Sequence, residues 1–211
     1  MKHLIIPSII AKNQAELATR VAKIKSLKPS FLQLDVMDGN FVKNTSFEFD
    51  FTLPKNMKTE AHLMVEHPDG WLNHNHSKIS SAVAHYKADT HMHLFIEKCR
   101  LIKKKVGIAI NPEVPVEAIA QYLNKIDKVL VMAVHPGKYG ARFLPEVIGK
   151  IKHLRELAPK LDIEVDGGIT PDTLARCKQA GANQFVVGSY LQNAKDVKMA
   201  WRELGASINN P

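Results

Sequence analysis

The chain has 211 residues, which is long enough for one sizeable domain with a large buried core. Its 45% hydrophobic and 24% charged residues are ordinary for a soluble globular protein, and no long apolar run predicts a membrane partner. The net charge of +8 comes from lysines and arginines spread through helical patterns without an aromatic stripe, which favours solvated helix faces over a nucleic-acid partner.

Short β-rich apolar runs alternate with amphipathic stretches along the whole chain. Strands are expected at residues 3–9, 31–37, 59–65, 81–86, 106–111, 128–134, 162–167 and 184–189. Helices are expected at residues 13–27, 68–78, 92–105, 115–124, 144–157, 172–180 and 194–205, with a single weak turn around Phe47 to Phe51. Eight such units predict an α/β fold, a (β/α)8 TIM barrel spanning residues 1–211 as a single domain. A doubly wound open sheet is the alternative, although no Gly-x-Gly-x-x-Gly follows the first strand.

The two cysteines, Cys99 and Cys177, lie in helical patterns and match no metal or redox spacing. The start of the chain does not resemble a signal peptide. We therefore expect a cytoplasmic protein whose thiols are ordinary packing residues.

Polar side chains gather at the carboxyl ends of the expected strands, the edge on which such barrels carry their active sites. They are Ser8, Gln33, Asp35, His62, His85, Asn111, His135 and Asp166. Each of them alone is compatible with a structural role, such as a hydrogen-bonded core histidine. Together they predict one site at one end of the barrel.

Asp35 and Asp166 are the candidate acid/base pair. Strand periodicity places Gln33 and Asp35 on one face of their strand, and it makes Asp35 a neighbour of His62 on the next strand. Asp166 lies three strands away around the ring, so the two carboxylates face a common pocket. That arrangement suits removal of a proton from one face of a carbon and its return to the other, which is epimerisation. Asp38 is out of phase, and we expect it to belong to a turn.

Three glycine-containing segments predict a phosphate site. They follow successive strands and read "HPGKYGARF" at residues 135–143, "DGGI" at 166–169 and "VGS" at 187–189. Glycines let backbone N–H groups approach an anion, and barrels of this kind commonly bind phosphate near their last two strands. A basic surface would steer such a substrate toward the protein.

These motifs, taken together, resemble the ribulose-phosphate 3-epimerase family in register from about residue 4 to residue 190. The matching segments are "PSII" at 7–10, "LDVMDGNFV" at 34–42, "AHLMVEHP" at 61–68, "INP" at 110–112, "LVMAVHPG" at 130–137, "EVDGGI" at 164–169 and "VGS" at 187–189. The resemblance implies an isomerase of the pentose phosphate pathway. It would invert C3 of a phosphorylated ketose, interconverting D-ribulose 5-phosphate and D-xylulose 5-phosphate through an enediolate.

The resemblance also implies roles for individual residues. Asp35 and Asp166 would be the acid/base pair and, with His62, would bind a divalent metal such as zinc, iron or manganese. Met37, Met64 and Met132 would form an apolar collar around the intermediate, and Ser8 would line the site. The phosphate would be surrounded by Gly137, Gly140, Gly167, Gly168, Gly188 and Ser189. Members of the family are commonly oligomeric, which implies a homo-oligomer.

The sequence departs from the family at four places. Gln33 replaces the histidine that is the fourth metal ligand, and an amide oxygen binds borderline metals less well than imidazole does. Asn40 and Lys87 replace a histidine and a glutamate. The phosphate loop reads "HPGKYGA" instead of "NPGFGGQ", and Lys138 or Arg142 would have to supply phosphate contacts by charge.

Three alternative functions stay open. The chain could act on a different phosphorylated ketose, such as a hexulose 6-phosphate. A decarboxylase or an aldol-type synthase on a related barrel would carry an Asp-x-Lys-x-x-Asp cluster, and residues 60–68 hold no lysine for it. A non-catalytic barrel that binds a phosphosugar or an anionic polymer would be compatible with Gln33, the altered loop and the positive charge.

Overall fold

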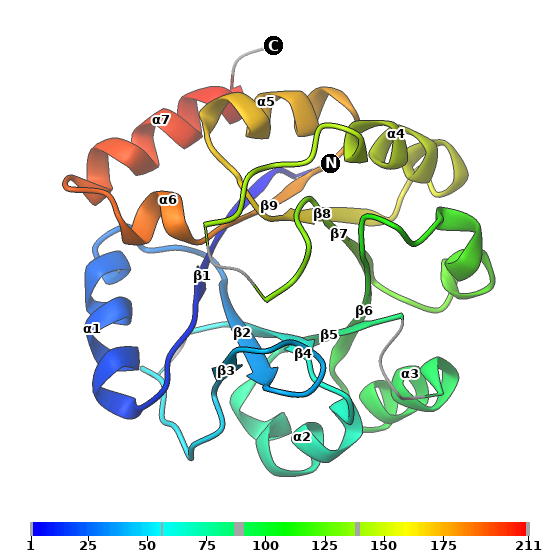
Figure 1. Ribbon diagram of the computed structural model, residues 1–211, viewed down its shortest axis with the longest axis horizontal. Coiled ribbons are helices and arrows are strands. Elements are labelled where there is room, and N and C mark those ends of the chain that lie inside the picture. Colours follow the sequence, from blue (N-terminus) through cyan, green and yellow to red (C-terminus); the bar gives the residue numbers. More distant parts are fainter. Residues whose placement is uncertain (1, 56, 87–90, 138–139, 210–211) are drawn as a thin grey trace.

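The computed structural model describes residues 2–55, 57–86, 91–137 and 140–209. Within them, eight parallel strands form a closed ring, because β1 pairs with both β2 and β9 (Figure 1). In ring order these strands are β1 (Leu4–Ile9), β2 (Leu32–Asp38), β4 (Thr59–Met64), β5 (Ser81–His85), β6 (Lys105–Ile110), β7 (Lys128–Met132), β8 (Asp162–Asp166) and β9 (Gln184–Val187). The predicted (β/α)8 barrel is confirmed, and the open sheet is excluded by the β1–β2 pairing.

Helices surround the ring of strands on its outside (Figure 1). The α-helices are α1 (Gln14–Lys25), α2 (Pro68–Asn75), α3 (Met92–Leu101), α4 (Val147–Leu157), α5 (Pro171–Gln179), α6 (Ser189–Gln192) and α7 (Val197–Asn209). Two further segments, η1 (His76–Lys78) and η2 (Val116–Tyr122), are 3₁₀ helices, so the stretch predicted at residues 115–124 is helical but more tightly wound than expected. None of the helices within the described residues has the length and apolar character needed to cross a bilayer.

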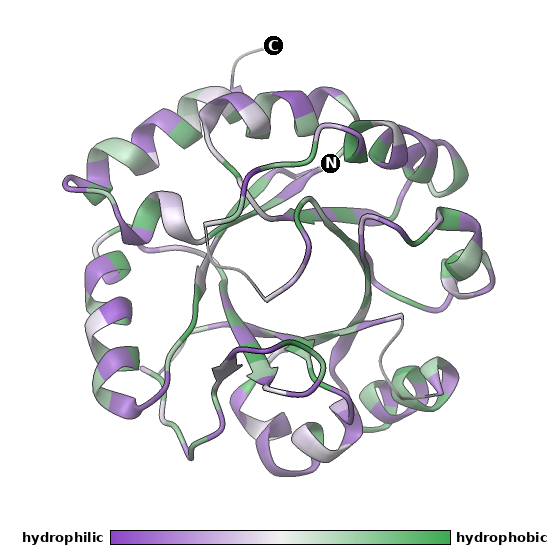
Figure 2. Ribbon diagram, in the orientation of Figure 1, coloured by the Kyte–Doolittle hydropathy of each residue, from purple (hydrophilic) through white to green (hydrophobic). Residues whose placement is uncertain are grey.

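Local sequence explains where the helices begin. In α1 the side chain of Asn13 accepts a hydrogen bond from the N–H of Glu16, and the Glu16 carboxylate accepts one from the N–H of Lys12. In α5 a capping box joins Thr170 and Thr173. The barrel strands are largely hydrophobic while the outer helices alternate in character (Figure 2), so the main core lies between strands and helices.

A polar cluster is buried inside the barrel, toward the amino ends of the strands. Lys128 Nζ lies 2.7 Å from Glu60 Oε2, 2.6 Å from Glu164 Oε2 and 2.7 Å from Gln184 Oε1. Burial alone would raise the pKa of Glu60, but the Lys128 ammonium, together with hydrogen bonds from Glu164 and Ser81, outweighs burial and lowers that pKa. Burial and the Glu60 charge raise the pKa of Glu164 well above its usual value. The buried cation therefore favours the charged form of Glu60, while Glu164 is the carboxyl of the pair that holds its proton more tightly.

The single turn of helix expected around Phe47 to Phe51 is absent, so that prediction was wrong. Instead β3 (Thr45–Ser46) pairs antiparallel with the end of β2. Ser46 Oγ accepts a hydrogen bond of 2.9 Å from the N–H of Ala11, and Phe47 has a φ of 59°, which a right-handed helix does not allow. The aromatic rings of this segment are buried against α2, and that packing overrides the local helical pattern.

Candidate active site

A cavity of about 200 Å³ opens at the carboxyl ends of the strands. It is lined by most of the residues for which the sequence predicts a catalytic, metal-binding or substrate-binding role: Ser8, Asp35, Met37, His62, Met64, Met132, Gly137, Gly140, Asp166, Gly167, Gly168, Gly188 and Ser189. The structure thus brings together residues from five strands and from the segments after β7, β8 and β9. Their individual roles stay predictions.

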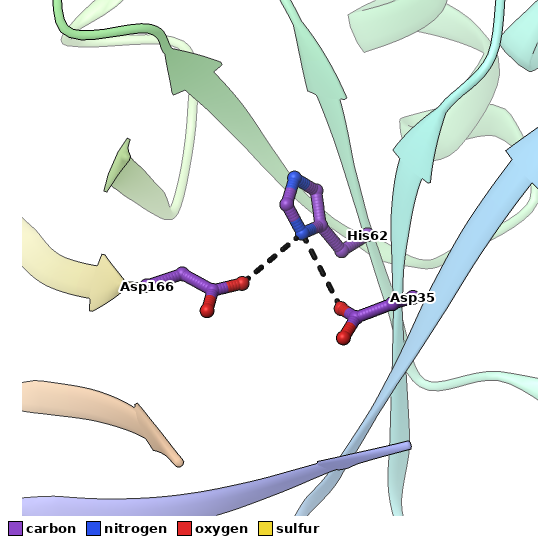
Figure 3. Close-up of side chains that lie close together, drawn as sticks. All are labelled: Asp35, His62 and Asp166. Carbon is purple, nitrogen blue, oxygen red and sulfur yellow. Dashed lines mark ion pairs between the residues drawn. The ribbon is translucent and has the colours of Figure 1, made fainter. Parts of the chain in front are cut away.

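The centre of the cavity holds Asp35, His62 and Asp166 (Figure 3). Asp35 on β2 is in register with His62 on β4, as the strand periodicity predicts. His62 Nδ1 lies 3.5 Å from Asp35 Oδ1 and 3.3 Å from Asp166 Oδ2, so one ring nitrogen faces both carboxylates. His62 is fully buried, while the Asp35 and Asp166 side chains keep 10% and 15% of their surface open to the cavity.

Gln33 lies directly beneath this cluster and is fully buried. Its Nε2 donates hydrogen bonds of 2.8 Å to Asp35 Oδ1 and of 2.8 Å to Asp166 Oδ2, and it is 3.4 Å from His62 Nδ1. Its Oε1 is buried and has no hydrogen-bond partner among the described residues. The residue that interrupts the family pattern therefore contacts every member of the central cluster.

His85 lies behind His62, outside the cavity lining. The two Nε2 atoms are 2.8 Å apart and the rings stack. Burial by itself lowers the pKa of His62, but hydrogen bonds and charges from Asp166 and Asp35 outweigh it and raise that pKa to about 10. Burial and the His62 charge lower the pKa of His85, so a protonated His62 donates its Nε2–H to a neutral His85. A metal at His62 Nδ1 would replace the proton there, because a ligating imidazole is neutral.

The Asp166 carboxyl also binds its proton more tightly than an isolated one. Burial is the largest cause and the negative charge of Asp35 adds to it, while His62 and Gln33 act in the opposite direction, and the net pKa is raised.

Two of the other polar candidates do not line the cavity. His135 is exposed, with its Nδ1 3.8 Å from Glu113 Oε2. Asn111 lies to one side, and its backbone carbonyl accepts a hydrogen bond of 2.8 Å from Lys150 Nζ. His135 therefore does not extend the central cluster, and Asn111 is connected to it through a side-chain hydrogen bond with His85.

Asp38 is the last residue of β2, and its side chain holds the turn that follows, which agrees with the structural role that its phase predicts. Its Oδ1 accepts hydrogen bonds of 2.9 Å from the N–H groups of Asn40 and Phe41, and its Oδ2 accepts one of 2.8 Å from the N–H of Glu66. Asn40 itself is exposed, and Lys87 lies outside the described residues.

Backbone conformation makes two glycines of the phosphate-site segments necessary. Gly167 and Gly168 have φ values of 112° and 63°. A Cβ at Gly168 would lie 2.7 Å from the backbone nitrogen of Phe143, and one at Gly167 would lie 2.5 Å from Val134 Cγ2. The chain after β8 is therefore held close to the loop after β7, beside the cavity.

Among the described residues, the lysine that lines the cavity is one that the sequence motifs did not single out. Arg142 is exposed and lines a neighbouring groove, and Lys138 lies outside the described residues. Lys12, in the loop after β1, lines the cavity instead, as does Asn44, whose Nδ2 donates to the Gly137 carbonyl. Lys12 and Asn44 both lie shortly after the end of an expected strand, and that position is the feature of the sequence that could have identified them as cavity residues.

The central donor set fits a divalent metal. One atom each from Asp35, His62 and Asp166 can be chosen so that all three lie within 4.8 Å of one another. Two carboxylate oxygens and one imidazole nitrogen are ligands that zinc, iron and manganese accept. The amide of Gln33 is close enough to affect any ion held there.

Comparison with known proteins agrees with this geometry. The profile of the ribulose-phosphate 3 epimerase family matches residues 4–192. Ribulose-phosphate 3-epimerases of Synechocystis and Schizosaccharomyces pombe are 33% and 34% identical over 202 and 199 residues, each match covering 90% of this chain and 88% and 87% of the relative. The Bacillus subtilis enzyme is 31% identical over 214 residues, 96% of this chain and 98% of its own.

Solved structures with the same fold are more distant in sequence. A 3-keto-L-gulonate-6-phosphate decarboxylase from Vibrio cholerae superposes with a TM-score of 0.74 at 11% identity, covering 99% of this chain and 98% of its own. The 3-hexulose-6-phosphate synthase of Salmonella typhimurium gives 0.70 at 13% identity, covering 97% and 98%. At such low identity these structures support the barrel alone. The family profile and the relatives above 30% identity show more: this chain belongs to the ribulose-phosphate 3-epimerase family of isomerases.

Proposed function

We propose that the chain interconverts D-ribulose 5-phosphate and D-xylulose 5-phosphate by inverting the configuration at C3. The observation that carries this proposal is the meeting of Asp35 and Asp166, from strands on different sides of the ring, at one cavity centred on His62. Membership of the family supports the same chemistry.

The C3 proton of the ketose is acidified by the adjacent C2 carbonyl. One of the two aspartates removes this proton as a general base, which leaves an enediolate, and the other returns a proton to the opposite face of C3 as a general acid. His62 and Gln33 hold the two carboxylates in place through the contacts described above. When bound by Asp35, His62 and Asp166, a divalent ion supplies Lewis-acid stabilisation of negative charge on the substrate.

The remainder of the cavity suits a small phosphorylated sugar. Met37, Met64 and Met132 are buried around the central cluster and would exclude water from the enediolate. Ser8 lines the same cavity. The glycine-rich loops after β7, β8 and β9 would bind the phosphate through backbone N–H groups.

Solvent exchange provides the direct test. In D₂O the protein should incorporate deuterium at C3 of ribulose 5-phosphate, followed by NMR, while xylulose 5-phosphate accumulates. A hexulose 6-phosphate assayed in parallel measures sugar choice. Absence of exchange with Mn²⁺, Zn²⁺, Fe²⁺ and Mg²⁺ each supplied would reject the proposal for the pentose. Sugar binding without any exchange would then favour the non-catalytic alternative.

Lys12 provides a prediction about the phosphate. We expect Lys12→Met to raise KM for ribulose 5-phosphate about three- to tenfold with little change in kcat, because a charge-assisted contact is lost far from C3. Steady-state kinetics of this variant and of Arg142→Ala, a surface cation outside the cavity, make the comparison. A raised KM in Arg142→Ala alone would assign the phosphate contact to that residue instead.

A further inference from the structure

The side-chain amide of Gln33 occupies the position of a fourth ligand but presents the wrong atom to a metal. Nε2 is 2.8 Å from Asp35 Oδ1, 2.8 Å from Asp166 Oδ2 and 3.4 Å from His62 Nδ1, the atoms with which the three candidate ligand residues face one another. Ligand atoms of a tetrahedral ion at bond lengths of about 2.0–2.2 Å lie roughly 3.3–3.6 Å apart, a separation that the 3.4 Å contact matches and that the two 2.8 Å hydrogen bonds fall somewhat short of. An amide nitrogen donates hydrogen bonds and offers no lone pair to a cation.

The orientation of this amide follows from hydrogen bonding. Rotating it by half a turn would place Oε1 against two carboxylate oxygens and replace two hydrogen bonds by repulsion between oxygens, while His62 Nδ1 at 3.4 Å would be the nearby group that could donate to it. With Nε2 inward, both N–H groups are used in hydrogen bonds to carboxylates, which are stronger than bonds between neutral groups. Oε1 is then the atom left buried without a partner among the described residues. Only a cation between the carboxylates would favour the reverse orientation.

We propose that the Gln33 amide is a built-in competitor of the metal. Its two N–H groups bind the carboxylates that a divalent ion would bind, and they hold Asp35 and Asp166 together without one. A metal ion bound through these same two oxygens would compete with both hydrogen bonds, and the compensation from Gln33 is at most one neutral amide oxygen, a ligand that a water molecule could replace. Gln33 is accordingly a positioning residue that weakens metal binding and lessens the need for a metal.

A metal titration of the whole protein tests this proposal without any turnover. Gln33→Met keeps a similar side-chain length, removes both N–H groups and introduces only a soft sulfur, which Mn²⁺ binds poorly. We expect the Kd for Mn²⁺, measured by EPR of free Mn²⁺ at fixed pH, to fall about tenfold or more relative to the parent. Gln33→His should lower it too, because imidazole replaces the competitor with a ligand.

Gln184→Met is the matched control, because Gln184 is a second barrel-interior glutamine whose amide contacts Lys128 and no member of the donor set. Its Kd should equal that of the parent. A weaker Mn²⁺ affinity in Gln33→Met would overturn the proposal and make Gln33 a ligand through Oε1, and an unchanged affinity would also overturn it. If Gln33→Met does not fold, Gln33→His alone tests the proposal. A Kd for Mn²⁺ equal to or above that of the parent would show that Gln33 does not compete with the metal.

Competition between Gln33 and a metal is a property of the resting site, so it can fail separately from the proposed activity. A negative deuterium-exchange assay leaves the metal titration valid. A negative titration leaves the two-aspartate chemistry untouched.

Discussion

Asp166→Asn is expected to lower kcat for epimerisation by about 10²- to 10⁴-fold, the usual contribution of a general acid or base. Asparagine has the shape of the aspartate and can still accept a hydrogen bond from Gln33 through its oxygen, so the site should keep its form. It can neither take a proton from C3 nor return one. The loss should therefore lie in the proton transfer rather than in substrate binding, and KM should change much less than kcat.

The measurement is a steady-state epimerase assay combined with deuterium incorporation at C3. Asp35→Asn should behave in the same way, because inversion needs a group on each face of the carbon. Asp38→Asn is the matched control. It makes the same chemical change in β2, the strand that carries Asp35, but at a carboxylate that holds a turn. Retention of more than about a tenth of the parent kcat in Asp166→Asn would remove Asp166 from the acid/base pair.

Lys128→Met is expected to destabilise the protein by about 3–5 kcal/mol, the range seen when one partner of a buried ion pair is removed. The substitution leaves two fully buried glutamates without the cation that balances them. Lys128 and both glutamates lie toward the amino ends of the strands, so the free energy of unfolding should change while the active-site geometry stays. Urea denaturation at neutral pH measures it.

Companion variants separate charge from packing. Glu164→Gln should cost much less than Lys128→Met, because the raised pKa of Glu164 favours its neutral form, which glutamine resembles, and because the cation and Glu60 both remain. The double variant Lys128→Met with Glu60→Gln should recover a large part of the loss, since it removes the unpaired anion as well. An equal loss in Lys128→Met and in Glu164→Gln would argue against the division of protons between the two glutamates.

The pH dependence of this loss has a definite sign. In the parent, Lys128 lowers the pKa of Glu60, so the stabilisation is present above the unfolded value of 4.5 and is lost as the pH falls through the folded pKa. In Lys128→Met, burial raises the Glu60 pKa, and protonation in acid relieves the unpaired charge. The difference in stability should therefore be largest near neutral pH and should shrink as the solution is acidified.

Several features of this protein are determined by its sequence. Period-two apolar runs such as "FLQLDVM" separated by amphipathic helices specify eight βα units, and these patterns depend only on near neighbours along the chain. Because parallel strands end at one edge, most of the cavity residues can be identified as strand-end positions from the sequence pattern by itself. The out-of-phase position of Asp38 likewise identifies its structural role in a turn correctly.

The tertiary structure alone decided the contacts between distant residues. Gln33 reads from its position as a poor metal ligand, and only the closed ring shows its amide nitrogen bonded to Asp35 and to Asp166, which is 133 residues further along the chain. No local sequence pattern pairs Lys128 with Glu60, and closure of the ring buries the two side chains against each other. Local patterns reflect the preferences of neighbouring residues, whereas hydrogen-bond partners and proton positions depend on which side chains ring closure brings within about 3 Å of each other.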